Sequence, residues 1–395
     1  MLFRYGTDSR GKLVKKAVVY TKSEHLISID RIDPDALQII NRLRDAGFTA
    51  YIVGGAVRDL IVGNTPKDFD IVTDATPSRI KRIFRNSRII GRRFRLVHVV
   101  FGSKIFEVST FRSNVDGSVG NDFGTIEQDV MRRDFTLNAL YYDPLQEQVI
   151  DYVGGLRDIK KHILRPVIPM DAIFVEDPVR MLRAIKYSAT THARMSFTLR
   201  HKIRASAALL SQVSPSRLTE EMLKIINSGH SAEIISEALD TDLYMYLQPA
   251  AAAMIYEKKD VEKTYMQNLS KMDELTRTQS DVRLGRKLYF LLYDFVSSLT
   301  DWKKEVQSGM PASELYARTW KECRNFVLPM NPQRRELEFA VRAVMSDLGV
   351  LFRQSPAKKA ANADGSVPAS KPKKKKKKSK AKKVVAVPVE EKIIS

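Results

Sequence analysis

Cysteine is nearly absent from this sequence, because Cys323 is the only one in 395 residues. A single thiol excludes an internal disulfide, and it also excludes a zinc site built from paired cysteines. No stretch reaches the roughly 18 consecutive apolar residues that a membrane-spanning helix requires. Residues 1–16 lack the apolar core and small-residue cleavage site of a secretory leader. We therefore expect a protein of the reducing cytoplasm.

Acidic residues are also in short supply, since 46 Asp and Glu stand against 66 Lys and Arg, a formal net charge of +20. Half of the excess lies in residues 355–395, where thirteen lysines face three acidic residues. A run of this kind is commonly a solvated, solubilising tail. Because the rest of the chain is equally basic, we expect a polyanionic partner, whose neutralised phosphates would release counterions. Nucleic acid is the first expectation and a membrane surface the second.

The hydrophobic periodicity divides the chain into a mixed part and a helical part. In the first part the pattern predicts strands at 50–53, 69–73, 96–101, 105–111, 137–142 and 149–152, with helices at 36–46, 56–62, 77–84 and 126–134. Beyond Pro178 it predicts helices almost exclusively, at 178–191, 197–211, 216–228, 232–240, 258–276, 283–298, 313–326 and 332–348. The expected fold class is α+β, a mixed α/β head followed by an all-helical body.

Five segments follow from this pattern and from the composition. We expect a basic surface arm without sustained periodicity, a head, a helical neck, a helical body and a disordered lysine-rich tail, at residues 1–30, 31–165, 166–230, 231–354 and 355–395. The tail contains six consecutive lysines and too little apolar surface to fold.

Two acidic residues flank a phenylalanine in Asp68-Phe69-Asp70. On a strand, residues two apart project from the same face, so both carboxylates would point in one direction. Such a pair is often only a solvated strand edge. It is also the kind of ligand that Mg²⁺ uses together with substrate phosphates.

A glycine-rich turn precedes this acidic pair, in Gly54-Gly55-Ala56-Val57-Arg58-Asp59. Glycines at a strand-to-helix junction let backbone N–H groups approach phosphate oxygens. Arg58 would lie in the first helical turn, where its guanidinium could bind a triphosphate in a bidentate manner. A tight turn without a ligand would also require glycine, but the acidic pair nearby favours a phosphate-and-metal site.

These motifs resemble the head of the class II nucleotidyltransferases of the polymerase β superfamily, which comprise the bacterial poly(A) polymerases and the CCA-adding tRNA nucleotidyltransferases. Three further stretches match the family in order: residues 132–139, Arg-Arg-Asp-Phe-Thr-Leu-Asn-Ala; residues 151–158, Asp-Tyr-Val-Gly-Gly-Leu-Arg-Asp; and residues 176–183, Glu-Asp-Pro-Val-Arg-Met-Leu-Arg. The resemblance covers residues 54–183 and implies transfer of a nucleotide to an RNA 3′ end with release of pyrophosphate.

The resemblance and the chemistry together suggest catalytic roles for four acidic residues. Asp68 and Asp70 are the expected ligands of two Mg²⁺ ions, with Mn²⁺ as an alternative. Glu107 on the following strand is a candidate third carboxylate, although pairing with an arginine such as Arg112 is equally compatible with the sequence. For Asp134 the resemblance implies an active-site role near the ribose, whereas the residues alone favour a local ion pair.

The remaining site residues are expected to bind the nucleotide. The resemblance implies that Asp177 and Arg180 read the edge of the base and that Glu176 orients Arg180. The full set of expected nucleotide-binding residues is Gly54, Gly55, Arg58, Arg132, Arg133, Asp177, Arg180 and Arg183.

The segment Gly91-Arg92-Arg93-Phe94-Arg95-Leu96-Val97-His98 resembles a stretch typical of bacterial poly(A) polymerases. Cations around one aromatic ring can hold an RNA 3′ end, so we expect Arg92, Arg93 and Arg95 to bind RNA. A basic loop leading into a strand is the simpler explanation without the resemblance.

The function expected is template-independent addition of AMP from ATP to RNA 3′ ends, which in bacteria promotes RNA decay. CCA addition to tRNA is the alternative, a non-catalytic RNA-binding protein is a weaker one, and a small-molecule nucleotidyltransferase would not need the basic helical body. The expected partners are RNA 3′ ends, ATP and RNA-decay proteins, with no membrane.

Overall fold

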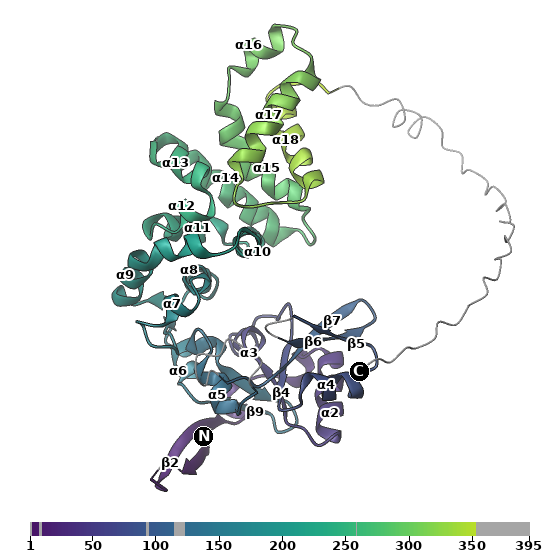
Figure 1. Cartoon of the computed structure of the whole chain (residues 1–395), viewed down its shortest axis with the longest axis vertical. Coiled ribbons are helices and arrows are strands. Elements are labelled where there is room, and N and C mark those ends of the chain that lie inside the picture. Colours follow the sequence, from purple (N-terminus) through teal and green to yellow (C-terminus); the bar gives the residue numbers. More distant parts are fainter. Residues whose placement is uncertain (1, 8–9, 92–94, 114–122, 258, 353–395) are drawn as a thin grey trace, which may run out of the picture. The chain divides into compact units, whose positions relative to one another are not determined.

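The computed structural model describes residues 2–7, 10–91, 95–113, 123–257 and 259–352. Strands and helices mix in the purple-to-blue part of Figure 1, and helices make up almost all of the teal-to-green part. The α+β class predicted from the sequence is therefore confirmed. The lysine-rich tail lies outside the described residues.

One mixed sheet of nine strands forms the centre of the head, in the order β1-β2-β9-β8-β3-β4-β7-β6-β5. Only β4 and β7 pair in parallel; the other neighbours are antiparallel. The strands are β1 (Leu2–Thr7), β2 (Leu13–Tyr20), β3 (Ala50–Val53), β4 (Asp70–Thr73), β5 (Ser87–Ile90), β6 (Leu96–Phe101), β7 (Lys104–Thr110), β8 (Leu140–Asp143) and β9 (Gln148–Asp151). A separate parallel pair joins β10 (Ile163–Leu164) to β11 (Arg194–Met195).

Alternate residues of the central strands enter two hydrophobic cores, one on each face of the sheet. Ile52 and Ile71 belong to the larger core, together with residues of α2 (Pro34–Asp45), α3 (Gly55–Ile61) and α4 (Pro77–Ile83). Tyr51 and Val72 belong to the smaller core, which includes Val130 of α5 (Ile126–Met131). Every second position of β3 and β4 is thereby fixed to one face.

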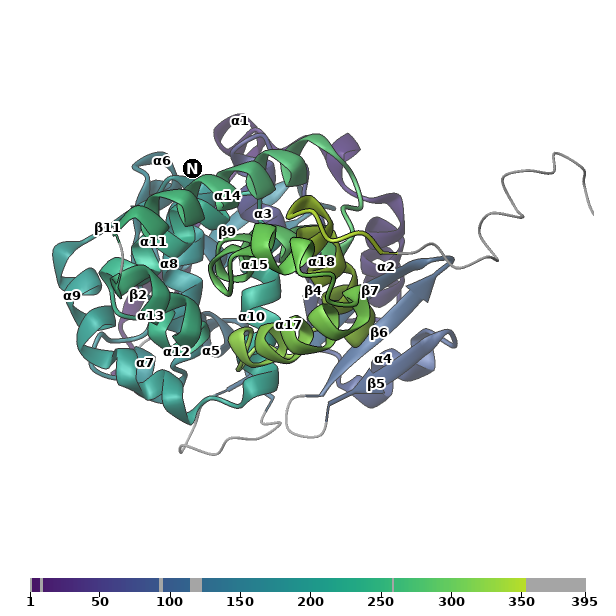
Figure 2. The same cartoon turned by 90° about the horizontal axis from the view of Figure 1, so that it is seen from above.

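The helical part begins near residue 173 and follows the predicted segments closely. Its helices are α7 (Ile173–Glu176), α8 (Val179–Thr191), α9 (Phe197–Ser206), α10 (Pro215–Ile226), α11 (Ser231–Asp240), α12 (Tyr244–Leu247), α13 (Pro249–Glu257), α14 (Lys259–Thr278), α15 (Leu284–Ser298), α16 (Trp302–Gln307), α17 (Ala312–Phe326) and α18 (Arg334–Asp347). Figure 2 shows α17 and α18 packed beside α15. None of the helices in the described part of the chain is both long and apolar enough to cross a membrane.

Residues 1–30, for which the sequence predicts a basic surface arm without sustained periodicity, contain regular secondary structure. Strands β1 and β2 form an antiparallel hairpin, and the inner half of β2 pairs with β9, so the hairpin extends the central sheet. The signal was obscured because the register shifts between Arg4 and Tyr5, which breaks the alternation of apolar and polar residues. The short helix α1 (Lys22–His25) follows, with a capping box between Thr21 and Glu24.

Two glycines determine the backbone next to the site. Gly54, between β3 and α3, has φ of 75°, a left-handed conformation that favours glycine. Gly155 begins α6 (Gly155–Lys160), and a side chain there would collide with the carbonyl oxygen of Thr136. Asp151 holds the same turn, because its carboxylate accepts hydrogen bonds from the backbone N–H groups of residues 153–156. The Asp-x-x-Gly-Gly stretch therefore positions the backbone around Asp134 to Asn138.

Candidate active site

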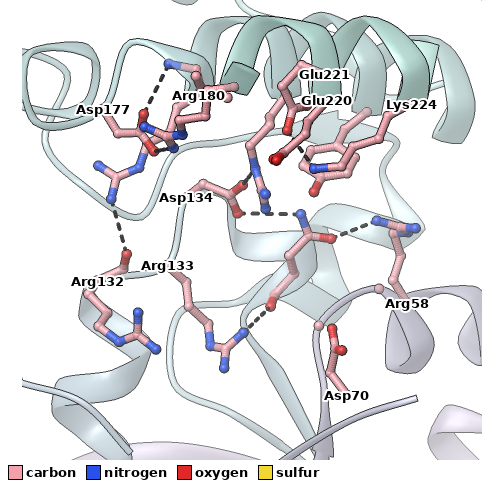
Figure 3. A pocket seen from close by; sticks show the side chains of 17 residues that line it. Arg58, Asp70, Arg132, Arg133, Asp134, Asp177, Arg180, Glu220, Glu221 and Lys224 are labelled. Carbon is pink, nitrogen blue, oxygen red and sulfur yellow. Dashed lines mark hydrogen bonds and ion pairs between the residues drawn. The ribbon is translucent and has the colours of Figure 1, made fainter. Parts of the chain in front are cut away.

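A cavity of about 590 Å³ lies where the glycine turn and β4 of the head meet helices α8 and α10. Its lining is rich in charge of both signs, with seven cationic side chains: Arg58, Arg132, Arg133, Arg180, Arg183, Arg217 and Lys224. Figure 3 shows five of these groups, Arg58, Arg132, Arg133, Arg180 and Lys224, around a common space, with Asp70 on the side of the head. A concave site of this composition is suited to an anionic ligand such as a triphosphate.

Two carboxylates, those of Asp70 and Glu107, lie on one face of the sheet beside this cavity. Asp70 precedes Ile71 on β4, Glu107 precedes Val108 on the parallel strand β7, and Ile71 and Val108 are register partners in the larger core. Asp70 and Glu107 therefore project side by side from the opposite face. Asp68, two residues before Asp70, was expected on that face as well. Of the three, only Asp70 lines the cavity.

The carboxyl group of Asp70 has a raised pKa. Desolvation by the surrounding protein, followed by the negative charges of Glu107 and Asp68 and opposed by Arg133, raises its pKa from 3.8 to about 6. Neither Asp68 nor Asp70 forms an ion pair with a described residue. Glu107 contacts His98 on β6, with 3.5 Å between Nε2 and Oε1 and more than half of the Glu107 side chain exposed, so the partner anticipated at Arg112 is replaced by His98.

The negative charge gathered around Asp70 is the feature that fits a divalent cation, because a cation between the carboxylates would relieve both repulsion and desolvation. Within the described ranges no group of three or more His, Cys, Asp or Glu side chains is arranged closely enough to hold a metal ion. The residues present therefore fit a site completed by substrate oxygens, as Mg²⁺ sites with only one or two carboxylates are. The space beside Gly55 is open to such a ligand, because a guanidinium nitrogen of Arg58 is the one described atom within 4 Å of the position that a Cβ atom would take.

A fully buried carboxylate, Asp129 on α5, holds both arginines of the Arg-Arg-Asp motif. It accepts hydrogen bonds from Arg132 at 2.6 and 2.9 Å, from Arg133 at 2.8 Å and from the hydroxyl of Tyr141 at 2.7 Å. Although burial opposes ionisation, the charges of Arg133 and Arg132 lower the pKa of Asp129 to about 2. The two guanidiniums are consequently fixed in the cavity wall before a ligand binds.

Asn138 connects the glycine turn to the Arg-Arg-Asp motif. Its side-chain carbonyl accepts a hydrogen bond from Arg58 at 2.7 Å, and its backbone carbonyl accepts one from Arg133 at 3.4 Å. Asp134 is held by Arg183 of α8, with 2.6 Å between Nε and Oδ2. The local ion pair considered for Asp134 thus exists, but with Arg183 instead of its neighbours in sequence.

The Glu-Asp-Pro-x-Arg stretch lies on the neck side of the cavity. Glu176 accepts a hydrogen bond from Arg180 at 2.8 Å, which is the orienting contact expected from the sequence. Arg180 also donates to the backbone carbonyls of Ile173 and Arg132. Asp177 accepts a hydrogen bond from the N–H of Val179 at 3.2 Å, and its other oxygen accepts one from Arg217 of α10 at 2.8 Å.

An aromatic ring and a second ion-pair group complete the wall. Tyr187 of α8 lies beneath the guanidiniums of Arg58 and Arg183, each 5.4 Å from the ring centre. Glu221 of α10 is buried and binds Lys224 at 2.7 Å, with Lys186 at 3.7 Å. Burial lowers the pKa of Lys186 to about 8, although Glu221 opposes this shift.

All eight residues expected to bind the nucleotide line the cavity, as do Asp70 and Asp134. Of the expected RNA-binding residues, Arg92 and Arg93 lie outside the described residues, and Arg95 is exposed and not among the lining residues. Seven polar members of the site or of its support were not predicted from the sequence: Asp129, Asn138, Tyr187, Arg217, Glu220, Glu221 and Lys224. Asn138 was inside a recognised motif, whereas the residues of α10 carried no signal in the sequence.

Comparisons with known proteins agree with this geometry. Residues 50–165 match the family described as "Poly A polymerase head domain", and residues 194–255 match "Probable RNA and SrmB- binding site of polymerase A". Poly(A) polymerase I of Escherichia coli O157:H7 is 36% identical over 338 residues, which cover 80% of this chain and 72% of that protein. The CCA-adding enzyme of Lactobacillus helveticus is 36% identical over 228 residues, 55% of this chain and 57% of that protein.

A solved structure is similar as well: the CCA-adding enzyme of Bacillus stearothermophilus in complex with CTP superposes with a TM-score of 0.56 at 26% identity, over 80% of this chain and 83% of that chain. Fold and cavity together define a nucleotidyltransferase. The chain belongs to the bacterial poly(A) polymerase family.

Proposed function

We propose that this protein extends RNA 3′ ends with AMP from ATP, without a template and with release of pyrophosphate. The observation that carries the proposal is the extent of similarity: the match to poly(A) polymerase I spans 338 residues and continues into the helical body, whereas the match to the CCA-adding enzyme spans 228. The excess of basic residues supports the same choice, because sequence-independent binding of RNA relies on phosphate contacts.

The acidic edge would hold divalent ions. Asp68 and Asp70 are the proposed ligands of two Mg²⁺ ions, with Glu107 close enough to share their charge, and Mn²⁺ can replace Mg²⁺. Such ions activate a 3′-hydroxyl and stabilise the departing pyrophosphate oxygen. The raised pKa of Asp70 supports this assignment, because burial and the nearby charges of Glu107 and Asp68 outweigh the opposing charges of Arg133 and Arg183.

The cationic wall would orient the nucleotide. Arg58, Arg132 and Arg133 are positioned to bind phosphate oxygens beside the glycine turn, while Asp134 is placed to approach the ribose. Asp177 and Arg180 would read the base, and their orientation is supported by Arg217 and Glu176 respectively. A protein side chain, and no nucleic-acid template, would then select ATP.

The direct test uses purified protein, Mg²⁺, each of the four nucleoside triphosphates separately, and two primers, an oligoadenylate and a tRNA that lacks its 3′ end. Long ladders with ATP on both primers are expected. Extension that stops after three nucleotides and occurs only on tRNA would establish CCA addition instead. Asp70→Ala is the inactive control for chemistry, and RNA affinity should remain nearly unchanged because Asp70 contributes no phosphate contact.

RNA-decay proteins are the proposed partners of the enzyme. Because the proposed substrates are ATP and RNA, the proposed location is the cytoplasm. The family description of residues 194–255 as an RNA and SrmB-binding site supports a protein partner in this segment. Co-purification with the unaltered protein, compared with variants that carry surface substitutions within residues 194–255, would test it.

A further inference from the structure

The hairpin of β1 and β2 carries an exposed surface that the cavity does not explain. Beyond the residues that pair with β9, several of its side chains are exposed, and Figure 1 shows the hairpin projecting from the sheet. Phe3, Tyr5 and Leu13 are 42%, 57% and 66% exposed. Exposed apolar side chains gathered in this way commonly mark an interaction site.

The register shows that these side chains share one face. Phe3 and Tyr5 are two residues apart on β1, Tyr5 is opposite Lys15, and Thr7 is opposite Leu13. The rings of Phe3 and Tyr5 lie 6.4 Å apart, and the ammonium group of Lys15 is 3.8 Å from the centre of the Phe3 ring. The opposite face is occupied differently, since Ala17 is buried in the smaller core and Arg4 interacts with Tyr152.

Charge indicates what this face binds. Residues 1–20 contain five cationic residues and one acidic residue. No described acidic side chain forms an ion pair with Lys15 or Lys16. Aromatic rings beside cationic side chains are suited to single-stranded nucleic acid, because its bases stack on the rings and its phosphates pair with the cations.

We propose that the outer face of the β1–β2 hairpin, formed by Phe3, Tyr5, Leu13 and Lys15, is a second RNA-binding surface that holds the single-stranded segment upstream of the 3′ end. The proposal rests on an RNA substrate as given under the proposed function. It adds a contact separate from the cavity, so that longer RNAs bind more tightly than short ones.

The test measures binding of labelled 30-nucleotide and six-nucleotide oligoadenylates by fluorescence anisotropy, without ATP, so that the outcome does not depend on catalysis. Phe3→Ala/Tyr5→Ala should weaken binding of the long RNA about fivefold or more, with a smaller effect on the short one. Phe3→Leu/Tyr5→Leu keeps an apolar surface but removes the rings, and it should reproduce most of the loss. Leu2→Ala, on the other face of the same strand, is the matched control and should bind normally.

Lys15→Ala should reduce the slope of log affinity against log salt concentration by about 0.7, the value for one phosphate contact on a single strand. Unchanged affinity for the long RNA in both aromatic variants would overturn the proposal. It would be overturned equally if these variants retained RNA binding and lost self-association or binding to phosphatidylglycerol vesicles. Failure of the enzyme to add AMP would refute the proposed function but would leave this binding result standing.

Discussion

Replacing Asp70 by asparagine separates the charge of this residue from its shape. Asp70 has a pKa of about 6 in the folded protein against 3.8 ordinarily. A folded-state pKa above the unfolded value means that the acid stabilises the fold fully below pH 3.8, and that this stability is lost as the pH rises through about 6. The amide of the Asp70→Asn variant cannot ionise, so the variant does not lose this stability as the pH rises.

The magnitude follows from the size of the shift. Two pKa units correspond to a ceiling of about 3 kcal/mol. Because Asp70 is exposed at the cavity edge, screening by water reduces the expected difference to about 1 kcal/mol. In metal-free buffer, Asp70→Asn should therefore be about 1 kcal/mol more stable than the unaltered protein at pH 7.5, and this advantage should vanish near pH 4.

The assay is urea unfolding with a chelator at both pH values, followed by repetition with Mg²⁺ at pH 7.5. Magnesium should stabilise the unaltered protein and leave the variant almost unaffected, since binding to the folded state alone raises stability. Asp45→Asn, on an exposed part of α2, controls for the loss of one negative charge. An equal stability difference at pH 4 and pH 7.5 would refute the proposed environment of Asp70.

Three further predictions concern the support of the site. Asp129→Asn should reduce the free energy of unfolding by about 3 kcal/mol, because Arg132 and Arg133 lose their common buried partner; a loss under about 1 kcal/mol in urea unfolding would contradict this role. Gly155→Ala should also cost about 3 kcal/mol by calorimetry and lower kcat, since the new methyl group would displace the backbone near Thr136, and wild-type stability would show that the turn adapts. Glu176→Gln should change the free energy of unfolding by about 0.5 kcal/mol at most, because the carboxylate of Glu176 is open to solvent. It should nevertheless raise KM for ATP and relax discrimination against CTP. Unchanged steady-state kinetics with both nucleotides would show that Arg180 needs no support from Glu176.

Local patterns predicted the parts of the site that depend on neighbours in sequence. Strand alternation led to the prediction that Asp68 and Asp70 share one face. The contact between Glu176 and Arg180 was expected from the family resemblance, and the two side chains are hydrogen-bonded. The central strands were placed within a few residues for the same reason, since their alternation is regular.

Partners that come from distant elements could not be predicted in this way. Arg217 meets Asp177 only because α10 packs beside the start of α8, and Arg183 reaches Asp134 across the boundary between head and neck. The hairpin at the N-terminus was not predicted, because its register is irregular and its apolar residues are exposed, so the sequence shows no sustained alternation of apolar and polar residues. Strand β5 and the short helices α12 and α16 lack enough residues to show a period.

The shared carboxylate of Asp129 has a consequence for how this protein can vary. Two guanidiniums in one wall depend on a single acid, so exchanging or moving either arginine would leave the buried carboxylate of Asp129 with less compensating charge. Engineering a new nucleotide preference is therefore more promising from the α10 side, where Arg217 and Lys224 are exposed and each is tied to one acid, than from the motif in the head.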